Sequence, residues 1–189
     1  MFQILRDYVP QNDNLILSLI GTLKNQEMAN GDQDEYQRVN AAALRLLTLC
    51  DRSKKDLRER LLKKDYPAGV VERVIQRLES MDYLNDERFA VKFAMDAVRR
   101  KNAGPAVVQC GLQQKGIERR IIDETVGKVF QENEEMEVAR QALSRKLEVR
   151  SKRSEGRGDE RKRLSDYLRR KGFSYDIIKA VMGEIEDEI

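Results

Sequence analysis

Three stretches of this chain follow one template, and the clearest reads Leu112-Gln113-Gln114-Lys115-Gly116-Ile117, then Ile121-Ile122 and Thr125-Val126. The other two stretches begin at Leu61 and Leu168. In each, an apolar residue follows the leucine after five positions, and two mostly apolar pairs follow at helical spacing. The template recurs after 51 and then 56 residues (61 to 112 to 168). This recurrence is typical of repeat proteins, in which each unit buries part of its apolar face against its neighbours.

Apolar stripes and end signals predict three helices in each unit. Ser53 begins an S-x-x-D variant of the capping box, and Pro67 suits the start of the following helix. Asp86 is predicted to cap the next helix, Gly104-Pro105 to start another, and Ser174 to cap the last one. The residues therefore predict an all-α protein of three tandem three-helix repeats.

The repeats divide the chain. We expect repeat 1 at 37–83, repeat 2 at 84–131 and repeat 3 at 132–189. Residues 1–36 do not follow the template, so we assign them to an N-terminal extension of open conformation that ends in a linker at 30–35. Residues 150–160 include no apolar side chain, which predicts a flexible basic loop inside repeat 3.

The composition excludes several classes of function. Charged residues make up 37% of the 189 residues and aromatics 6%, which favours solvated helices over one large core. The chain has no histidine, the commonest acid–base group and metal ligand. No P-loop, glycine-rich phosphate cradle or nucleophile elbow is present. We therefore expect no catalytic residue, no metal and no cofactor, and a protein that is not an enzyme.

The apolar stripes, Phe89 and Phe93 included, are assigned to the cores. Cys50 and Cys110 lie in apolar helical patterns without a CxxC partner, so we expect small buried thiols in a reducing compartment. Residues 1–10 lack the features of a secretory signal, and the apolar run 15–20 is too short to cross a bilayer. The expectation is a soluble cytoplasmic protein that does not bind membranes.

A set of short motifs over about residues 38–189 resembles the RecX family of bacterial regulators of the RecA recombinase. The matching motifs are Ser53-x-x-Asp56-Leu57, Tyr83-Leu84-Asn85-Asp86-Glu87-Arg88-Phe89-Ala90, Gly104-Pro105, Leu112-x-x-Lys115-Gly116-Ile117 and Leu168-x-x-Lys171-Gly172-Phe173. Two positions depart from the pattern. Asp82 stands before the Tyr-Leu pair where the family usually has glycine, and Asp65 stands where the later repeats have Gly116 and Gly172. Aspartate tolerates the left-handed conformation better than most residues and can replace glycine there.

The resemblance implies an elongated, curved body of three tandem three-helix units. It also implies binding along the helical groove of the RecA–DNA filament, with modulation, usually inhibition, of strand exchange and of ATP hydrolysis by RecA. The implied partners are the RecA filament and DNA, the latter bound weakly or through the filament. We expect a monomer.

Basic residues cluster in each unit although the net charge is only +3. The candidate partner- and nucleic-acid-binding residues are Lys54, Lys55, Arg58, Lys63, Arg99, Arg100, Lys101, Lys115, Arg119, Arg120, Lys162, Arg163, Arg169 and Arg170. One hypothesis is a discontinuous basic strip that recurs on the second helix of each unit and faces phosphates or an acidic protein groove. The other is a set of ordinary solvated helix faces, since Lys and Arg are good helix formers. No aromatic ladder accompanies the charges, so base stacking is not expected.

Two further interpretations are open. Three-helix units also suit a direct DNA-binding regulator of the helix-turn-helix type, which a gel shift on naked duplex would reveal. A generic two-helix scaffold fits less well, because a period near 34 residues does not match the observed spacing.

Overall fold

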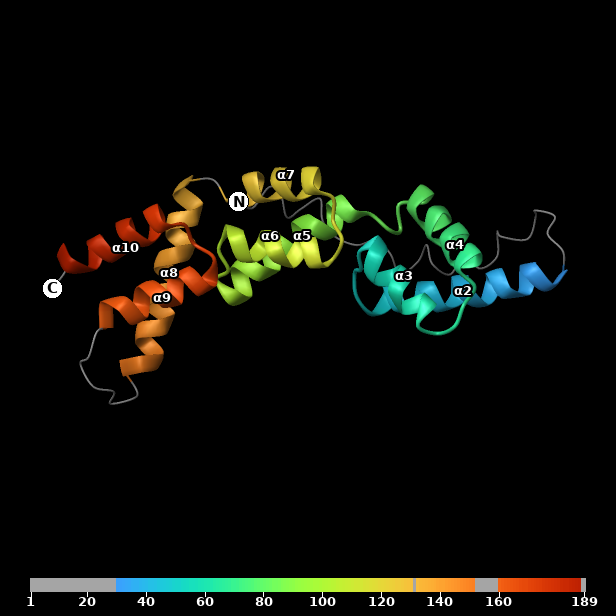
Figure 1. The fold of residues 1–189 in the computed structure, drawn as a ribbon, viewed down its shortest axis with the longest axis horizontal. Coiled ribbons are helices and arrows are strands. Elements are labelled where there is room, and N and C mark those ends of the chain that lie inside the picture. Colours follow the sequence, from blue (N-terminus) through green and yellow to red (C-terminus); the bar gives the residue numbers. More distant parts are fainter. Residues whose placement is uncertain (1–29, 131, 152–159, 188–189) are drawn as a thin grey trace.

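The computed structural model describes residues 30–130, 132–151 and 160–187, and all regular structure in these ranges is helical. Repeat 1 consists of α2 (Asn30–Leu49), α3 (Lys54–Leu62) and α4 (Ala68–Ser80). Repeat 2 consists of α5 (Asp86–Lys101), α6 (Pro105–Gln114) and α7 (Arg119–Val129). Repeat 3 consists of α8 (Glu132–Ser151), α9 (Glu160–Lys171) and α10 (Tyr175–Asp187). The three units follow one another along an elongated molecule (Figure 1), which confirms the predicted fold class.

Each repeat has its own small core. Leu57, Leu61 and Val74 are fully buried in the first. Ala90, Val108 and Leu112 are fully buried in the second, and Ala139, Ala142 and Leu168 in the third. Burying one large aliphatic side chain contributes about 1.5–3 kcal/mol. The core of each repeat therefore holds its three helices together, and smaller sets of contacts join one repeat to the next.

Most of the predicted helix ends are confirmed. Ser53 Oγ accepts the N–H of Asp56 at 3.1 Å, and Ser174 Oγ accepts that of Ile177 at 3.4 Å. The predicted cap at Asp86 is wrong. Asn85 caps α5 by accepting the Arg88 N–H at 2.9 Å, because an N-cap side chain must lie one residue before the first helical turn.

The linker predicted at 30–35 is also wrong, because α2 begins at Asn30. Its first turns make tertiary contacts that local composition does not reveal. Arg73 of α4 donates to Asp32 at 2.9 Å, and its guanidinium lies 5.6 Å from the ring centroid of Tyr36. Residues 1–29 of the predicted extension, and 152–159 of the predicted basic loop, lie outside the described residues.

Among the described residues, five adopt the left-handed conformation; one is Asn102 (φ 47°), which follows α5, and the other four lie in turns. These four are Asp65 (φ 61°), Asp82 (φ 58°), Gly116 (φ 73°) and Gly172 (φ 90°), so aspartate does replace glycine at both departures from the family pattern. The two glycines meet a second requirement. A Cβ at Gly172 would lie 2.5 Å from the backbone nitrogen of Val107, and one at Gly116 would lie 2.8 Å from Cβ of Lys55.

The repeats are joined through their second helices. At the first joint, Ser53 Oγ at the start of α3 donates to the carbonyl of Lys115 at 2.7 Å. At the second, the N–H of Gly104 at the start of α6 donates to the carbonyl of Lys171 at 2.7 Å. The end of α6 thus meets the start of α3, and the end of α9 meets the start of α6. This order brings negative helix ends to positive ones, which is favourable.

A cation-rich groove between the first two repeats

Several of the candidate residues are used within the fold. Lys54 Nζ lies 2.8 Å from Glu79, and Arg58 makes two bonds to Glu72 at 2.5 and 2.9 Å, so both tie α3 to α4. The backbone N–H of Lys54 also donates to Asp86 at 2.9 Å, which links α3 to α5. Both side chains therefore stabilise repeat 1, and a partner would have to compete with these ion pairs.

The prediction that the basic strip recurs on each second helix is wrong for repeat 2. The second helix there, α6, has no lysine or arginine. Arg119 and Arg120 instead begin α7, where each pairs with an acid four residues on, Asp123 and Glu124. These short-range pairs are the ordinary pattern of a solvated helix face.

Another group of candidates lies in the last turns of helices, where cations complement the negative end of the helix dipole. Its members are Arg99, Arg100 and Lys101 in α5, and Arg169 and Arg170 in α9. The remaining candidates, Lys55, Lys63, Lys162 and Arg163, are exposed. The aliphatic stem of Lys55 also covers Gly116 at the first joint.

Three of the candidates meet at a groove where repeats 1 and 2 join. Arg100, Lys101 and Lys115 line this groove, which encloses about 620 Å³. The other basic side chains of its lining, which were not among the candidates, are Arg52, Arg60 and Lys92. Only three acids, Asp51, Asp56 and Asp96, line the same groove, so cations outnumber carboxylates two to one.

Two charged rows form the groove walls. Asp56 and Arg60 lie four residues apart on α3, and Arg52 lies four residues before Asp56 in the loop that precedes this helix. Lys92, Asp96 and Arg100 follow at four-residue spacing along α5. Residues four apart share one helix face. The four-residue spacing of charged side chains was visible in the sequence. It predicts a row of charges on one helix face even where basic residues are not densely clustered.

Asp56 is the electrostatic centre of the groove. Its carboxylate is 2.7 Å from Arg52, 2.8 Å from Arg60 and 3.7 Å from Lys115. Burial alone would raise the pKa of Asp56, but hydrogen bonds from Arg60 and Arg52 and the charge of Lys115 outweigh it and lower that pKa. Asp56 therefore stays ionised and holds cations from two repeats in place.

The floor of the groove is apolar. Phe89 and Phe93 stack with ring centroids 6.1 Å apart and, with Leu49, contribute to the lining. Both rings are half-buried, so the prediction that they belong to the core is confirmed in part. They pack against the second core on one side and face the groove on the other.

The prediction of buried thiols is wrong too, because Cys50 and Cys110 are both exposed. Cys50 follows the last residue of α2, beyond the stripe that faces the core. Cys110 lies between the buried Val108 and Leu112 of α6, and residues two positions from an inward-facing residue point away from it.

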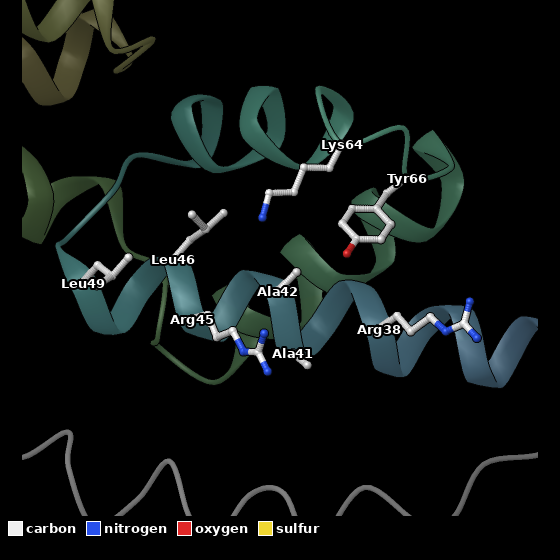
Figure 2. A pocket seen from close by; sticks show the side chains of 8 residues that line it. All are labelled: Arg38, Ala41, Ala42, Arg45, Leu46, Leu49, Lys64 and Tyr66. Carbon is white, nitrogen blue, oxygen red and sulfur yellow. The ribbon is translucent and has the colours of Figure 1, made fainter.

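A second hollow of about 520 Å³ lies between α2 and the turn that joins α3 to α4. In Figure 2, Lys64 and Tyr66 of this turn lie across from Leu46 and Ala42 of α2. Arg38 and Arg45 are the other basic residues of its lining, which includes no carboxylate.

Other kinds of site are not found in the described residues. No group of three or more Cys, Asp or Glu in these ranges could hold a metal ion. Within the same ranges, no helix has the length and apolar character needed to cross a membrane.

A tandem array of three-helix units defines a protein of the helical-repeat class. Family models for the first, second and third three-helix domains of RecX match residues 41–78, 85–126 and 133–182. The chain belongs to the RecX family of regulatory proteins.

Relatives named regulatory protein RecX agree with this assignment. The one from Clostridium acetobutylicum is 29% identical and aligns over 83% of this chain and 73% of its own length. The one from Streptomyces coelicolor is 31% identical over 86% of this chain and 85% of its own length. The one from Bacillus subtilis is 33% identical over 82% of this chain but only 58% of its own length.

Solved RecX structures share the fold. The crystal structure of RecX from Lactobacillus salivarius superposes with a TM-score of 0.70 at 23% identity, over 82% of this chain and 98% of that one. A second crystal structure of a regulatory protein RecX gives a TM-score of 0.69 at 22% identity, over 89% of this chain and 84% of that one.

Proposed function

We propose that this protein binds along the groove of the RecA–DNA filament and inhibits strand exchange and ATP hydrolysis by RecA, without catalytic activity of its own. The observation that carries the proposal is the cation-rich groove at the first joint of a chain in the RecX family. Its excess of positive charge is complementary to phosphates and to acidic protein surfaces.

The elongated shape supports the same proposal. Three units joined in a row present a longer surface than a compact domain of equal mass. A ligand that prefers one state of a filament shifts the filament toward that state by its difference in affinity. Binding that spans neighbouring RecA subunits would therefore oppose the rearrangements that strand exchange and ATP hydrolysis require. The protein acts in this proposal as a cytoplasmic monomer.

The test compares the wild-type chain with a groove variant, Lys92→Glu/Arg100→Glu. Both side chains are exposed and line the groove. The matched control is Lys64→Glu/Lys128→Glu, which makes the same change of charge at two exposed lysines outside the groove. The measurements are the DNA-dependent ATPase and strand-exchange activities of RecA at increasing concentrations of each protein.

We expect the wild-type chain and the control to inhibit both activities, and the groove variant to need about tenfold more protein, which corresponds to about 1.4 kcal/mol of binding free energy. Absence of inhibition by the wild-type chain would contradict the proposal. Tight, sequence-selective binding to naked duplex without an effect on RecA would instead favour the direct DNA-binding regulator, which the three-helix units also suit.

A further inference from the structure

Four cationic side chains from three helices meet at the second joint, between repeats 2 and 3. Lys101 ends α5, Arg145 and Lys146 lie on α8, and Lys171 ends α9. The ammonium groups of Lys146 and Lys171 each lie 5.5 Å from the ring centroid of Tyr167. Lys171 Nζ also donates to the backbone carbonyl of Lys101. We call Lys101, Arg145, Lys146 and Lys171 the joint cluster.

The packing of the joint holds Arg145 in the cluster. Its Nη1 donates to Oδ1 of Asn102 at 2.5 Å. Asn102 is 3% exposed and ends α5 in the left-handed conformation. Its amide nitrogen has no hydrogen-bond partner among the described residues, an arrangement that costs stability. The hydrogen bond to Asn102 therefore places the exposed Arg145 at the joint.

In the part of the chain that the structure describes, the joint cluster differs from several other basic groups, which pair with acids. Arg58 pairs with Glu72, Arg120 with Glu124, and Lys54 with Glu79. Within the described residues, no carboxylate pairs with any of the four members of the joint cluster. Burial, with the charges of Lys101 and Arg145, lowers the pKa of Lys171. The joint therefore has a local excess of positive charge.

We propose that the joint cluster binds a phosphodiester group of a nucleic-acid backbone. This deepens the proposed function and rests on it, because the nucleic acid in question is the one that the RecA filament holds. An arginine fork and several ammonium donors match the geometry and charge of a phosphate. Two ammonium groups cover the ring of Tyr167, so the ring is not open to a stacked base. The contact is consequently independent of base sequence.

The test uses the full chain and a fluorescein-labelled thymidine homopolymer, with the dissociation constant measured over a series of salt concentrations. The variants are Lys146→Gln and Lys146→Gln/Lys171→Gln, which remove charge from the joint cluster and change no residue that lines the groove between repeats 1 and 2. The control is Lys64→Gln/Lys128→Gln, with two exposed lysines outside the joint cluster. Circular dichroism verifies that each variant keeps its helices.

Each lost phosphate contact on a single strand lowers the slope of log K against log salt by about 0.7. We expect a decrease of about 0.7 for the single variant and about 1.4 for the double variant, with the control close to wild type. Equal slopes for wild type and double variant, an equal decrease in the control, or no binding by the wild-type chain would each overturn the inference.

The RecA ATPase assay on the same proteins separates this inference from the proposed function. If the wild-type chain leaves the ATPase unchanged but the salt slope decreases in the variants as expected, the proposed function is contradicted and phosphate binding at the joint cluster is supported. A wild-type chain that inhibits the ATPase, with equal slopes in all variants, removes the joint cluster inference alone.

Discussion

Replacing Gly172 with alanine should open the second joint. Gly172 has φ 90°, and a Cβ there would lie 2.5 Å from the backbone nitrogen of Val107 and 2.9 Å from its Cγ2. The backbone of α6 cannot withdraw without disturbing two hydrogen bonds, from Gly104 N–H to Lys171 at 2.7 Å and from Ala106 N–H to Gly172 at 3.1 Å. Relief of the clash therefore separates repeat 3 from repeat 2.

The expected loss of stability has two parts. A non-glycine residue in the left-handed conformation costs about 1–2 kcal/mol. Overpacking against a rigid neighbour costs about 1–3 kcal/mol. The free energy of unfolding should fall by about 2–5 kcal/mol, the sum of these two ranges. Most of this lost stability should come from the joint. Among the described residues, Val98 is the one partly buried hydrophobic residue of repeat 2 that packs against the third core, so few other contacts hold repeat 3 to repeat 2.

Urea unfolding followed by circular dichroism measures the effect, and two other glycines supply controls. Gly104→Ala would place a Cβ 2.7 Å from the Gly172 carbonyl without a left-handed backbone, so it should cost only the overpacking part, about 1–3 kcal/mol. Gly127→Ala lies inside α7 with nothing within 4 Å of the new Cβ and should stabilise by about 0.5–1 kcal/mol.

A free energy of unfolding for Gly172→Ala within about 0.5 kcal/mol of wild type, the range of an ordinary surface substitution, would contradict this prediction. Destabilisation by Gly127→Ala as large as that by Gly172→Ala would also contradict it. In either case the close approach of the two backbones would not set the stability of the joint.

Further outcomes follow from the first two repeats. Ser53→Ala removes a helix cap and a buried hydroxyl bond to the next repeat, and should lower the urea-derived free energy of unfolding by about 1–3 kcal/mol. Because folding lowers the pKa of Asp56, its contribution to stability is present above the unfolded value of 3.8 and is lost as pH falls through the folded value. Asp56→Asn should therefore flatten the acid limb of stability against pH. Phe89→Ala should lower the free energy of unfolding in urea by about 2 kcal/mol, less than the roughly 3–5 kcal/mol of a fully buried phenylalanine, because Phe89 is only partly buried. Cys50 and Cys110 should both react with a thiol reagent in the folded protein, and protection of either would contradict their exposure.

The fold was predictable because its signals are local. A cap such as Ser53 and an N-terminal proline such as Pro105 act within one helical turn. The left-handed turns at Asp65 and Asp82 also follow from residue type. The start of α2 was missed because contacts with Arg73, 41 residues from Asp32, help to hold it.

The candidate site was less predictable because partners decide the role of a charge. Arg58 and Glu72 are 14 residues apart, and only the fold shows that they pair. Candidates chosen by the local density of basic residues came from α3 and did not include Lys92. Lys92 matters because it lies in the charged row of α5 and faces the opposite wall of the groove. Lys146, in the joint cluster, lies in a helix of mixed charge and is distinguished only by its neighbours in space.

The turn at Asp65 has a consequence for self-association. Gly116 and Gly172 let their turns seat on the preceding unit, and Asp65 occupies the corresponding turn of repeat 1 with an exposed, charged side chain. A head-to-tail contact that does not close on itself generates fibres when both complementary ends are free. A Cβ at Gly116 or Gly172 would lie less than 3 Å from the preceding unit, so we expect that the first turn of one molecule, with aspartate at this position, does not seat on the last unit of another in the same way.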